Sequence, residues 1–451
     1  MIVFRKRLII WLIRAYIKKW GKVIVFSFII GLVLFFTLLF TSKYFIHTPL
    51  LHKRVTYGMV GAYTVDTLPP EVLGKLSHGL TTVDNSGQVK PDVAASWEIR
   101  NNGKTYIFHL KKGLHFVNGD EVTANRIHYN FSDVTVNRPD PYTIVFHLKY
   151  QYSPFLVTVS QPIFQKNFIG VGNYRIEKSS LNGSFIQSLT IGSIKNAFDS
   201  ESYQFYPTEN ALKLGFIMGE VTDALGLDSQ TFKNQKISSY PGVTVRRNVD
   251  YSQLVTLFYD TEDSVLSDKK IRDSLTYSLP DTFSEGERSY VSYPKSSLYF
   301  NKDYLDPRQD DTHARLLLES ATVGTHSALP VLTLKTFPRY ANVAKIIQHA
   351  WSKIGVKIKI ENVDHVPPHF QIFLGDFNVP KDPDQYVLWH SGQTTNIANY
   401  KNLRIDKLLE DGRKITSTAK RQSIYQEFQK YLLDDSPASF LYFPYSYEIS
   451  R

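Results

Sequence analysis

Cysteine is absent from this 451-residue chain. A folded domain outside the cell would therefore have no disulfide to stabilise it, and no thiol is available to carry a lipid anchor. Metal sites built on cysteine are excluded as well, and the thirteen histidines show none of the spacings that are typical of metal ligands. We therefore expect neither a metal site nor a cofactor.

The sequence motifs that mark common enzyme active sites are also missing. The chain has no Gly-x-Ser-x-Gly, no His-Glu-x-x-His and no phosphate-binding Gly-x-x-x-x-Gly-Lys-Ser/Thr. His390 stands beside Ser391, but without the turn that presents a catalytic nucleophile. Gly170 and Gly172 lack the third glycine of a dinucleotide-binding loop and predict a turn. These absences favour a binding protein over an enzyme.

Acidic residues are absent from the first 22 residues, and this explains most of the net charge of +10. The basic residues there are Arg5, Lys6, Arg7, Arg14, Lys18, Lys19 and Lys22. The rest of the chain, with 45 basic and 42 acidic residues, is nearly neutral. Because binding to a phosphate backbone needs a concentrated basic surface, this distribution argues against nucleic acid as a partner.

Residues 23–40 contain no charged side chain and, extended to residue 41, have about the length that spans a bilayer. Basic residues are concentrated before this segment, so the positive-inside rule predicts a cytoplasmic N-terminus and an extracellular or periplasmic C-terminal part. The alternative is a cleaved signal peptide, but no small-x-small cleavage site follows Phe40. We expect a basic cytoplasmic segment (1–22), a single-pass anchor in the cell membrane (23–41) and a juxtamembrane stalk (42–54). Residues 4–20 mix basic and apolar positions and are also suited to lie along the inner leaflet.

Beyond the stalk, signals for strands and helices are mixed, which indicates an α/β fold. The segment from 331 to 361 has the strand–helix–strand pattern of a βαβ unit and predicts a mixed or parallel sheet. The expected strands are 55–60, 104–110, 142–148, 331–336, 356–361 and 439–442. The expected helices are 123–131, 343–354, 405–415 and 419–433.

A long, ordered series of motifs occupies this folded part. It includes Gly79-Leu80, Asp84 with Gly87, Pro91 with Ala94 and Trp97, residues 103–110, Gly113, Phe116, Gly119 and Thr123-Ala124. It continues at residues 170–174, 219–224, 268–278, 304–321, 382–384, 399–400, 405–409 and 435–442. The series resembles the extracellular solute-binding proteins, family 5, which serve oligopeptide, dipeptide and nickel ABC importers. The chain departs from the family at Arg126, where Asp is usual, and is shorter than typical members between Phe131 and Gly170.

The resemblance implies a periplasmic-binding-protein-like two-lobe clamp of the large peptide-binding type, preceded by the transmembrane helix. The expected parts are lobe I (about 55–75, 165–255 and 432–451), a trimmed lobe II (about 76–164) and lobe III (about 256–431), with hinges near Phe258 and Leu433. The implied function is capture of peptides or similar small solutes outside the cell. Lobe closure would then deliver them to the permease and ATPase subunits of an ABC transporter, with no chemistry on the solute.

The resemblance also implies a set of ligand-binding residues. In the family, an Asp in a Trp-x-x-Asp arrangement pairs with the α-amino group of the peptide, and Phe373 and Asp376 occupy the matching places here. The alternative for Asp376 is a role in the turn that follows. Tyr386 and Trp389 are candidates for aromatic walls of the cleft or for core positions, and Asn399 and Tyr400 complete the set.

Two other functions fit the same sequence. One is a peptide-sensing ectodomain that signals through a separate membrane partner, because about twenty cytoplasmic residues are too few for a signalling domain. The other is a binder of a nickel or haem-type ligand.

Overall fold

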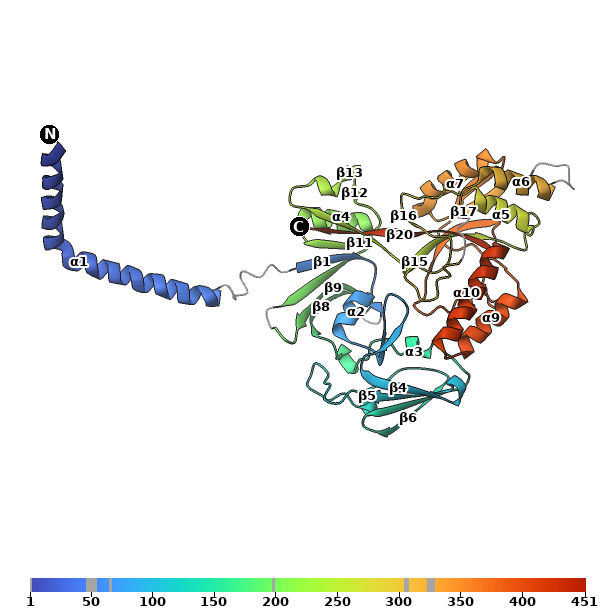
Figure 1. The fold of residues 1–451 in the computed structure, drawn as a ribbon, viewed down its shortest axis with the longest axis horizontal. Coiled ribbons are helices and arrows are strands. Elements are labelled where there is room, and N and C mark those ends of the chain that lie inside the picture. Colours follow the sequence, from blue (N-terminus) through green and yellow to red (C-terminus); the bar gives the residue numbers. More distant parts are fainter. Residues whose placement is uncertain (1, 46–54, 65–66, 197–198, 304–307, 323–328) are drawn as a thin grey trace.

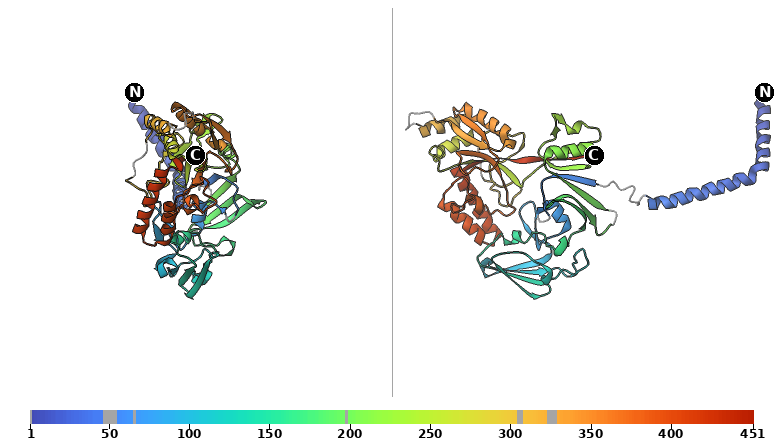
Figure 2. Two further views of the ribbon diagram at one scale, coloured as in Figure 1. Left: turned by 90° about the vertical axis from the view of Figure 1, so that its right-hand side faces the viewer. Right: turned by 180° about the vertical axis from the view of Figure 1, so that it is seen from behind.

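The structure is a computed structural model that describes residues 2–45, 55–64, 67–196, 199–303, 308–322 and 329–451. Most of the predicted stalk, residues 46–54, lies outside the described residues. Helix α1 (Ile2–Phe45) extends away from a globular part made of three lobes, as Figure 1 and the reverse view in Figure 2 show. Among the described residues, no single helix is long and apolar enough to cross a membrane. One bent pair, Ile13–Val23 with Val25–Thr37, has this length and composition when the two segments are taken together.

Lobe III is a sheet covered by helices on both faces. Its strands are β15 (Gln253–Tyr259), β16 (Gly286–Arg288), β17 (Leu332–Thr336), β18 (Ile358–Asn362), β19 (Ile372–Asn378) and the first half of β20 (Ala438–Ser450). Its helices are α5 (Lys269–Tyr277), α6 (Asp311–Thr322), η6 (Pro338–Tyr340), α7 (Ala341–Lys353), α8 (Tyr386–Trp389), α9 (Leu403–Lys414) and α10 (Thr418–Asp435). Helices α5 to α7 cover one core and α8 to α10 the other.

The predicted βαβ unit in lobe III is confirmed. Strands β17 and β18 are parallel and α7 connects them, with β17 also parallel to β19. Helix α7 forms because Val343, Ile347, Ala350 and Trp351 recur at helical spacing and are buried against the sheet. The helices expected over 405–415 and 419–433 correspond to α9 and α10.

Lobe I is a second part of the same twelve-stranded sheet, in the order β11-β1-β10-β9-β8. Its elements are β1 (Val55–Val60), α2 (Pro70–Leu76), β8 (Tyr174–Asn182), β9 (Phe185–Ser193), β10 (Ser200–Tyr206), α4 (Glu209–Met218), β11 (Asp223–Leu227), β12 (Thr231–Phe232), β13 (Gln235–Lys236) and β14 (Thr244–Val249). Separate apolar clusters form around α2 and around α4, so both faces of this sheet are also covered.

Lobe II is a small antiparallel sheet in the order β4-β5-β7-β6. Its elements are β2 (Thr81–Val83), β3 (Val89–Pro91), β4 (Ala94–Arg100), β5 (Thr105–Leu110), β6 (Val134–Asp140), β7 (Thr143–Leu148) and α3 (Phe155–Thr158). The predicted strands at 104–110 and 142–148 are β5 and β7, and Tyr106, Phe108 and Phe146 fill the core between them.

Strand β20 connects lobes I and III. Its first half pairs with β15, and its second half pairs with β14 and β11. The chain therefore crosses between the lobes near Asp250 and near Pro444, where the Asp250 backbone N–H donates to the Pro444 carbonyl at 2.8 Å. The structure thus differs from the expected crossings near Phe258 and Leu433. The last strand also continues beyond the predicted end at Tyr442, as far as Ser450, because its second half pairs with β14 and β11.

The helix expected over residues 123–131 is wrong. Only a 3-10 turn, Ala124–Arg126, forms there. The Arg138 side chain donates to the carbonyls of Ala124 and Ile127 at 2.8 and 2.9 Å, which helical N–H groups would otherwise use. The next residues extend across lobe II, where the rings of Tyr129 and Phe131 stack 5.3 Å apart.

Candidate functional site

Asp376 lies near the carboxyl end of β19, on the face that it shares with Ile372 and Leu374. Those two apolar side chains are buried in the core beneath α5 and α7, whereas the Asp376 side chain keeps 11% of its surface exposed. Because side chains alternate along a strand, Phe373 and Phe377 point to the opposite core. Asp376 is thus a carboxylate at the rim of an apolar surface.

Arg339 and Tyr340 reach Asp376 from the neighbouring strand. Strand β17 runs parallel to β19 with Thr336 opposite Leu374, so the turn η6 that follows β17 lies at the same edge of the sheet. Arg339 Nη2 donates to Asp376 Oδ1, and the guanidinium lies 4.9 Å from the centre of the Tyr340 ring. Desolvation and then the charge of Asp376 raise the pKa of Tyr340, whose hydroxyl is within hydrogen-bonding reach of that carboxylate.

Asp228 follows β11 on the lobe I side. Glu209, the first residue of α4, accepts hydrogen bonds of 3.2 Å from the backbone N–H groups of Asp228 and the next residue, and pairs with the buried Lys213. Desolvation by the surrounding protein, followed by the charge of Glu209, raises the pKa of Asp228, whereas Arg339 and Lys213 act in the opposite direction. The charge of Asp376 also acts on Asp228. Charged groups of lobes I and III therefore lie within electrostatic reach of each other.

We call these five residues the interlobe cluster: Glu209, Lys213, Asp228, Arg339 and Asp376. The cluster combines three carboxylates with two cations, which leaves one negative charge in excess when all are ionised. Tyr442 of β20 lies two strands from Asp376, because Val255 of β15 pairs with both residues. Asp376 is therefore close to the Pro444 crossing, and the excess negative charge of the cluster would favour a positively charged group nearby.

Three of the residues predicted from the sequence lie together in the core beneath α8 to α10. Phe373 and Trp389 are each 1% exposed, and their rings stack on Phe258 at 6.4 and 6.1 Å. Tyr400 is 4% exposed and its hydroxyl donates to Asp435 at 2.5 Å. These side chains pack on the far face of the strand that carries Asp376.

The other two predicted residues lie elsewhere in lobe III. Asn399 is exposed, has a positive φ of 50°, and donates through Nδ2 to Asp260 at 3.0 Å. Tyr386, the first residue of α8, stacks on His390 at 4.2 Å and lines a pocket between lobes II and III. The six predicted residues are therefore not brought together at one place.

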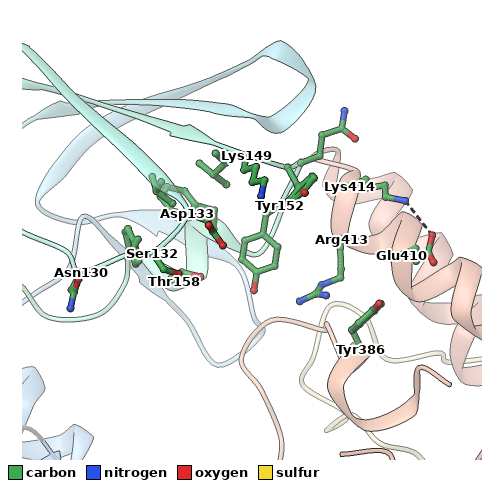
Figure 3. A pocket seen from close by; sticks show the side chains of 16 residues that line it. Asn130, Ser132, Asp133, Lys149, Tyr152, Thr158, Tyr386, Glu410, Arg413 and Lys414 are labelled. Carbon is green, nitrogen blue, oxygen red and sulfur yellow. Dashed lines mark hydrogen bonds and ion pairs between the residues drawn. The ribbon is translucent and has the colours of Figure 1, made fainter. Parts of the chain in front are cut away.

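The pocket between lobes II and III has a volume of about 610 Å³. Seven of its sixteen lining residues are aromatic or aliphatic and nine are polar or charged. The charged ones come from both lobes, as Figure 3 shows. The guanidinium of Arg413 lies between two tyrosine rings, 5.3 Å from Tyr152 of lobe II and 4.2 Å from Tyr386. Arg413 Nε also lies 2.9 Å from Asp384, and the Arg413 carbonyl accepts a 2.6 Å hydrogen bond from the N–H of Ser153. The two lobes are thus in direct contact here.

Comparison with known proteins places this arrangement in a family. The family model described as bacterial extracellular solute-binding proteins, family 5, matches residues 88–399, which is more than half of the chain. The chain belongs to this family. The resemblance stated from the motifs is therefore confirmed.

Several relatives of this family 5 protein have been characterised. The oligopeptide-binding protein AppA of Bacillus subtilis is 23% identical over 85% of this chain and 83% of its own length. The structure of AppA with a nonapeptide matches with a TM-score of 0.64 at 19% identity, covering 88% of this chain and 94% of that one. NikZ of Campylobacter jejuni in complex with Ni(L-His) matches with a TM-score of 0.69 at 19% identity, with the same coverage. These likenesses confirm the predicted α/β, periplasmic-binding-protein-like fold.

Sequence reasoning missed four members of the interlobe cluster in this family 5 protein. Arg339 carried a usable signal, because it follows a strand predicted to be parallel to its neighbours, and the carboxyl ends of parallel strands meet at one edge. Glu209, Lys213 and Asp228 carried none, because their approach to lobe III depends on how the two lobes are placed.

Proposed function

We propose that this family 5 protein is the membrane-anchored substrate-binding subunit of an ABC importer, and that it captures peptides outside the cell through their free amino terminus. It binds and releases the solute without changing it chemically. The observation that carries the proposal is the interlobe cluster: Asp376 lies at the carboxyl edge of the lobe III sheet, two strands from Tyr442 of the crossing strand, and its charge acts on Asp228 of lobe I.

The charge of the cluster suits an ammonium group. One positive charge from a ligand would balance the excess negative charge, and an ammonium placed between Asp376 and Asp228 would relieve the unfavourable ionisation of Asp228. The Asp376 carboxylate is paired with Arg339, whose side chain is 55% exposed and so has room to move aside when a ligand enters. Of the residues predicted from the sequence, we propose Asp376 as the direct contact. Phe373, Trp389 and Tyr400 hold β19 and its connecting loop in place from behind.

Lobe closure follows from the same geometry. A ligand that contacts both lobes binds the closed form more tightly than the open form, and so shifts the population toward closure. In the part of the chain that the structure describes, two segments cross between lobes I and III, near Asp250 and Pro444, and we expect bending to occur there. The closed form would present the surface that the permease recognises.

The anchor is supported by α1. Its bent pair of segments together has the length and composition of a membrane span. The large apolar side chains described between Val25 and Phe36 are all exposed to the surroundings rather than packed against the lobes. Apolar side chains that no part of the protein covers are suited to a hydrocarbon environment. The basic residues before them favour a cytoplasmic N-terminus.

A thermal-shift experiment on the full chain in detergent tests the proposed function. The ligands are a pool of short peptides, the same pool with acetylated amino termini, and a nickel(II)–histidine complex. A ligand at a hundredfold its Kd adds about 2.7 kcal/mol to the free energy of unfolding, so the free peptides should raise Tm by several degrees. The acetylated pool should raise it much less. An equal shift with both pools contradicts recognition of the amino terminus, and a shift with nickel–histidine alone favours the metal-complex alternative.

A further inference from the structure

Helix α1 changes direction where its basic part meets its apolar part. The segments Ile13–Val23 and Val25–Thr37 meet at 55°, and Figure 1 shows the N-terminal part turning away from the rest of the helix. Gly21 lies within one turn of the bend, and glycine is one of the residues at which helices bend sharply. The bend therefore separates an apolar segment from an N-terminal arm, residues 10–22, that points in another direction.

The arm has two different faces. Arg14, Lys18 and Lys22 are spaced by four residues and lie on one stripe of the helix. Ile13, Ile17 and other large side chains lie on roughly the opposite stripe. These are Ile13, Tyr16, Ile17 and Trp20, each at least 45% exposed, whereas Ile10 and Trp11 lie nearer to the basic stripe. Residues 10–22 contain no acidic side chain, so nothing in the arm itself neutralises the basic stripe.

The bend angle fits a helix that lies flat on the membrane. Transmembrane helices tilt by about 20° on average and by up to about 40°. If the apolar segment tilts by about 35° away from the arm, a 55° bend brings the arm perpendicular to the bilayer normal. A helix with apolar residues on one side and lysine or arginine on the other is stable in that orientation when anionic headgroups face its basic side.

We propose that the arm lies in the plane of the membrane, with Ile13 and Ile17 buried at the headgroup boundary and Lys18 and Lys22 paired with anionic lipid headgroups. The proposal rests on the anchoring part of the proposed function. The arm fixes the rotation of α1 and holds its cytoplasmic end against the bilayer, where a membrane-embedded permease is accessible.

The test uses the full chain in lipid nanodiscs, made of phosphatidylcholine alone or mixed with phosphatidylglycerol. The natural chain has no cysteine, so Ile17→Cys, Lys18→Cys and Ile29→Cys each introduce a single position for an environment-sensitive fluorophore. Quenching by acrylamide, which is neutral, reports exposure to water. In the mixed lipid we expect the label at position 17 to be quenched several-fold less than the label at 18. In phosphatidylcholine alone this difference should become small.

Replacing two cations of the basic stripe sharpens the test. Each lysine near an anionic surface contributes roughly a fivefold factor in binding, so adding Lys18→Gln and Lys22→Gln to Ile17→Cys should raise quenching at position 17 in the mixed lipid. Equal quenching at positions 17 and 18 in the mixed lipid, with the label at 29 protected, overturns the arm proposal and leaves the anchor intact. A label at 29 that is quenched as strongly as the one at 18 overturns the anchor and the arm together.

Discussion

Lobe III contacts its two neighbours through different chemistry. Toward lobe I it presents the interlobe cluster, in which three carboxylates share two cations. Toward lobe II it presents Arg413, which already has an ion pair with Asp384 and a tyrosine ring on each side. The first contact has unbalanced charge, whereas the second is balanced by the protein itself. We therefore expect the contact between lobes III and I to rearrange when a ligand binds. We expect the contact between lobes III and II to stay the same.

The largest expected effect is the loss of ligand binding when Asp376 is neutralised. In Asp376→Asn, the ligand ammonium loses the charged partner in lobe III, and losing one member of a buried charge pair commonly costs 2 kcal/mol or more. We expect the Kd for the free-amino peptide pool to rise by at least about thirtyfold, measured by isothermal titration calorimetry.

The matched control for this variant is Glu361→Gln. Glu361 lies near the carboxyl end of β18 in the same sheet, but it is paired with Lys359 at 2.8 Å and lies outside the cluster. Its replacement should leave the Kd unchanged. An unchanged Kd in Asp376→Asn would show that the interlobe cluster is not the ligand site.

From the sequence, the fold of lobe III could be predicted better than the set of residues that surround Asp376. Apolar periodicity was enough for the βαβ unit of β17, α7 and β18, because local spacing determines which face each side chain buries. Asp376 was predicted only through the family motif. The predicted parallel strands could have indicated Arg339 as its partner, but nothing local indicated that Asp228 would approach from another lobe. The wrong helix over residues 123–131 and the wrong end of the last strand at Tyr442 have the same origin. In each, a contact distant in sequence decides whether a helix forms or a strand continues.

A second prediction tests whether the contact between lobes II and III is structural. In Arg413→Ala, Tyr152 and Tyr386 lose the cation between their rings, and Asp384, whose pKa is already raised by burial, loses its counter-ion. We expect the free energy of unfolding in urea to fall by about 1–2 kcal/mol. The Kd for peptide should change by less than about threefold, because distant sites act independently.

The neighbouring Lys414 provides the control for that variant. It lines the same pocket, but its side chain is 47% exposed and pairs with Glu410 on the surface. Lys414→Ala should change the free energy of unfolding by no more than about 0.5 kcal/mol. If Arg413→Ala weakened peptide binding as strongly as Asp376→Asn, the pocket between lobes II and III would belong to the ligand site and the contrast between the two contacts would fail.

A smaller effect is expected from pH, through Asp228. Desolvation and Glu209 raise the pKa of Asp228, while Arg339 and Lys213 oppose them and Asp376 adds to the shift. A ligand ammonium favours the ionised form, so affinity should be full above the raised pKa and should decline as the pH falls through it. Titrations between neutral and mildly acidic pH should show this decline in the wild type and a flatter profile in Asp228→Asn. Identical profiles in both proteins would remove Asp228 from the site.

The smallest expected effect concerns the junction between lobes I and II, where His78 Nδ1 lies 3.2 Å from Asp92 Oδ2. The hydrogen bond to Asp92 raises the pKa of His78 more than burial lowers it. A raised pKa means that the protonated form is stabilised by folding. The contribution of protonated His78 to the free energy of unfolding is complete below its pKa in the unfolded chain, about 6.5. It is lost as the pH rises through the raised pKa of His78 in the folded protein. Because 39% of the His78 side chain is exposed, solvent weakens the interaction.

Urea unfolding at several pH values checks this prediction. The difference in the free energy of unfolding between wild type and His78→Gln should be greatest at mildly acidic pH and should shrink as the solution becomes alkaline. In an Asp92→Asn background the same His78 substitution should show little dependence on pH, because its partner has no charge. A difference that stayed constant with pH in the wild-type background would mean that His78 contributes by packing alone. The ion pair at the junction of lobes I and II would then contribute nothing to stability, unlike the pair of Arg413 and Asp384 between lobes II and III.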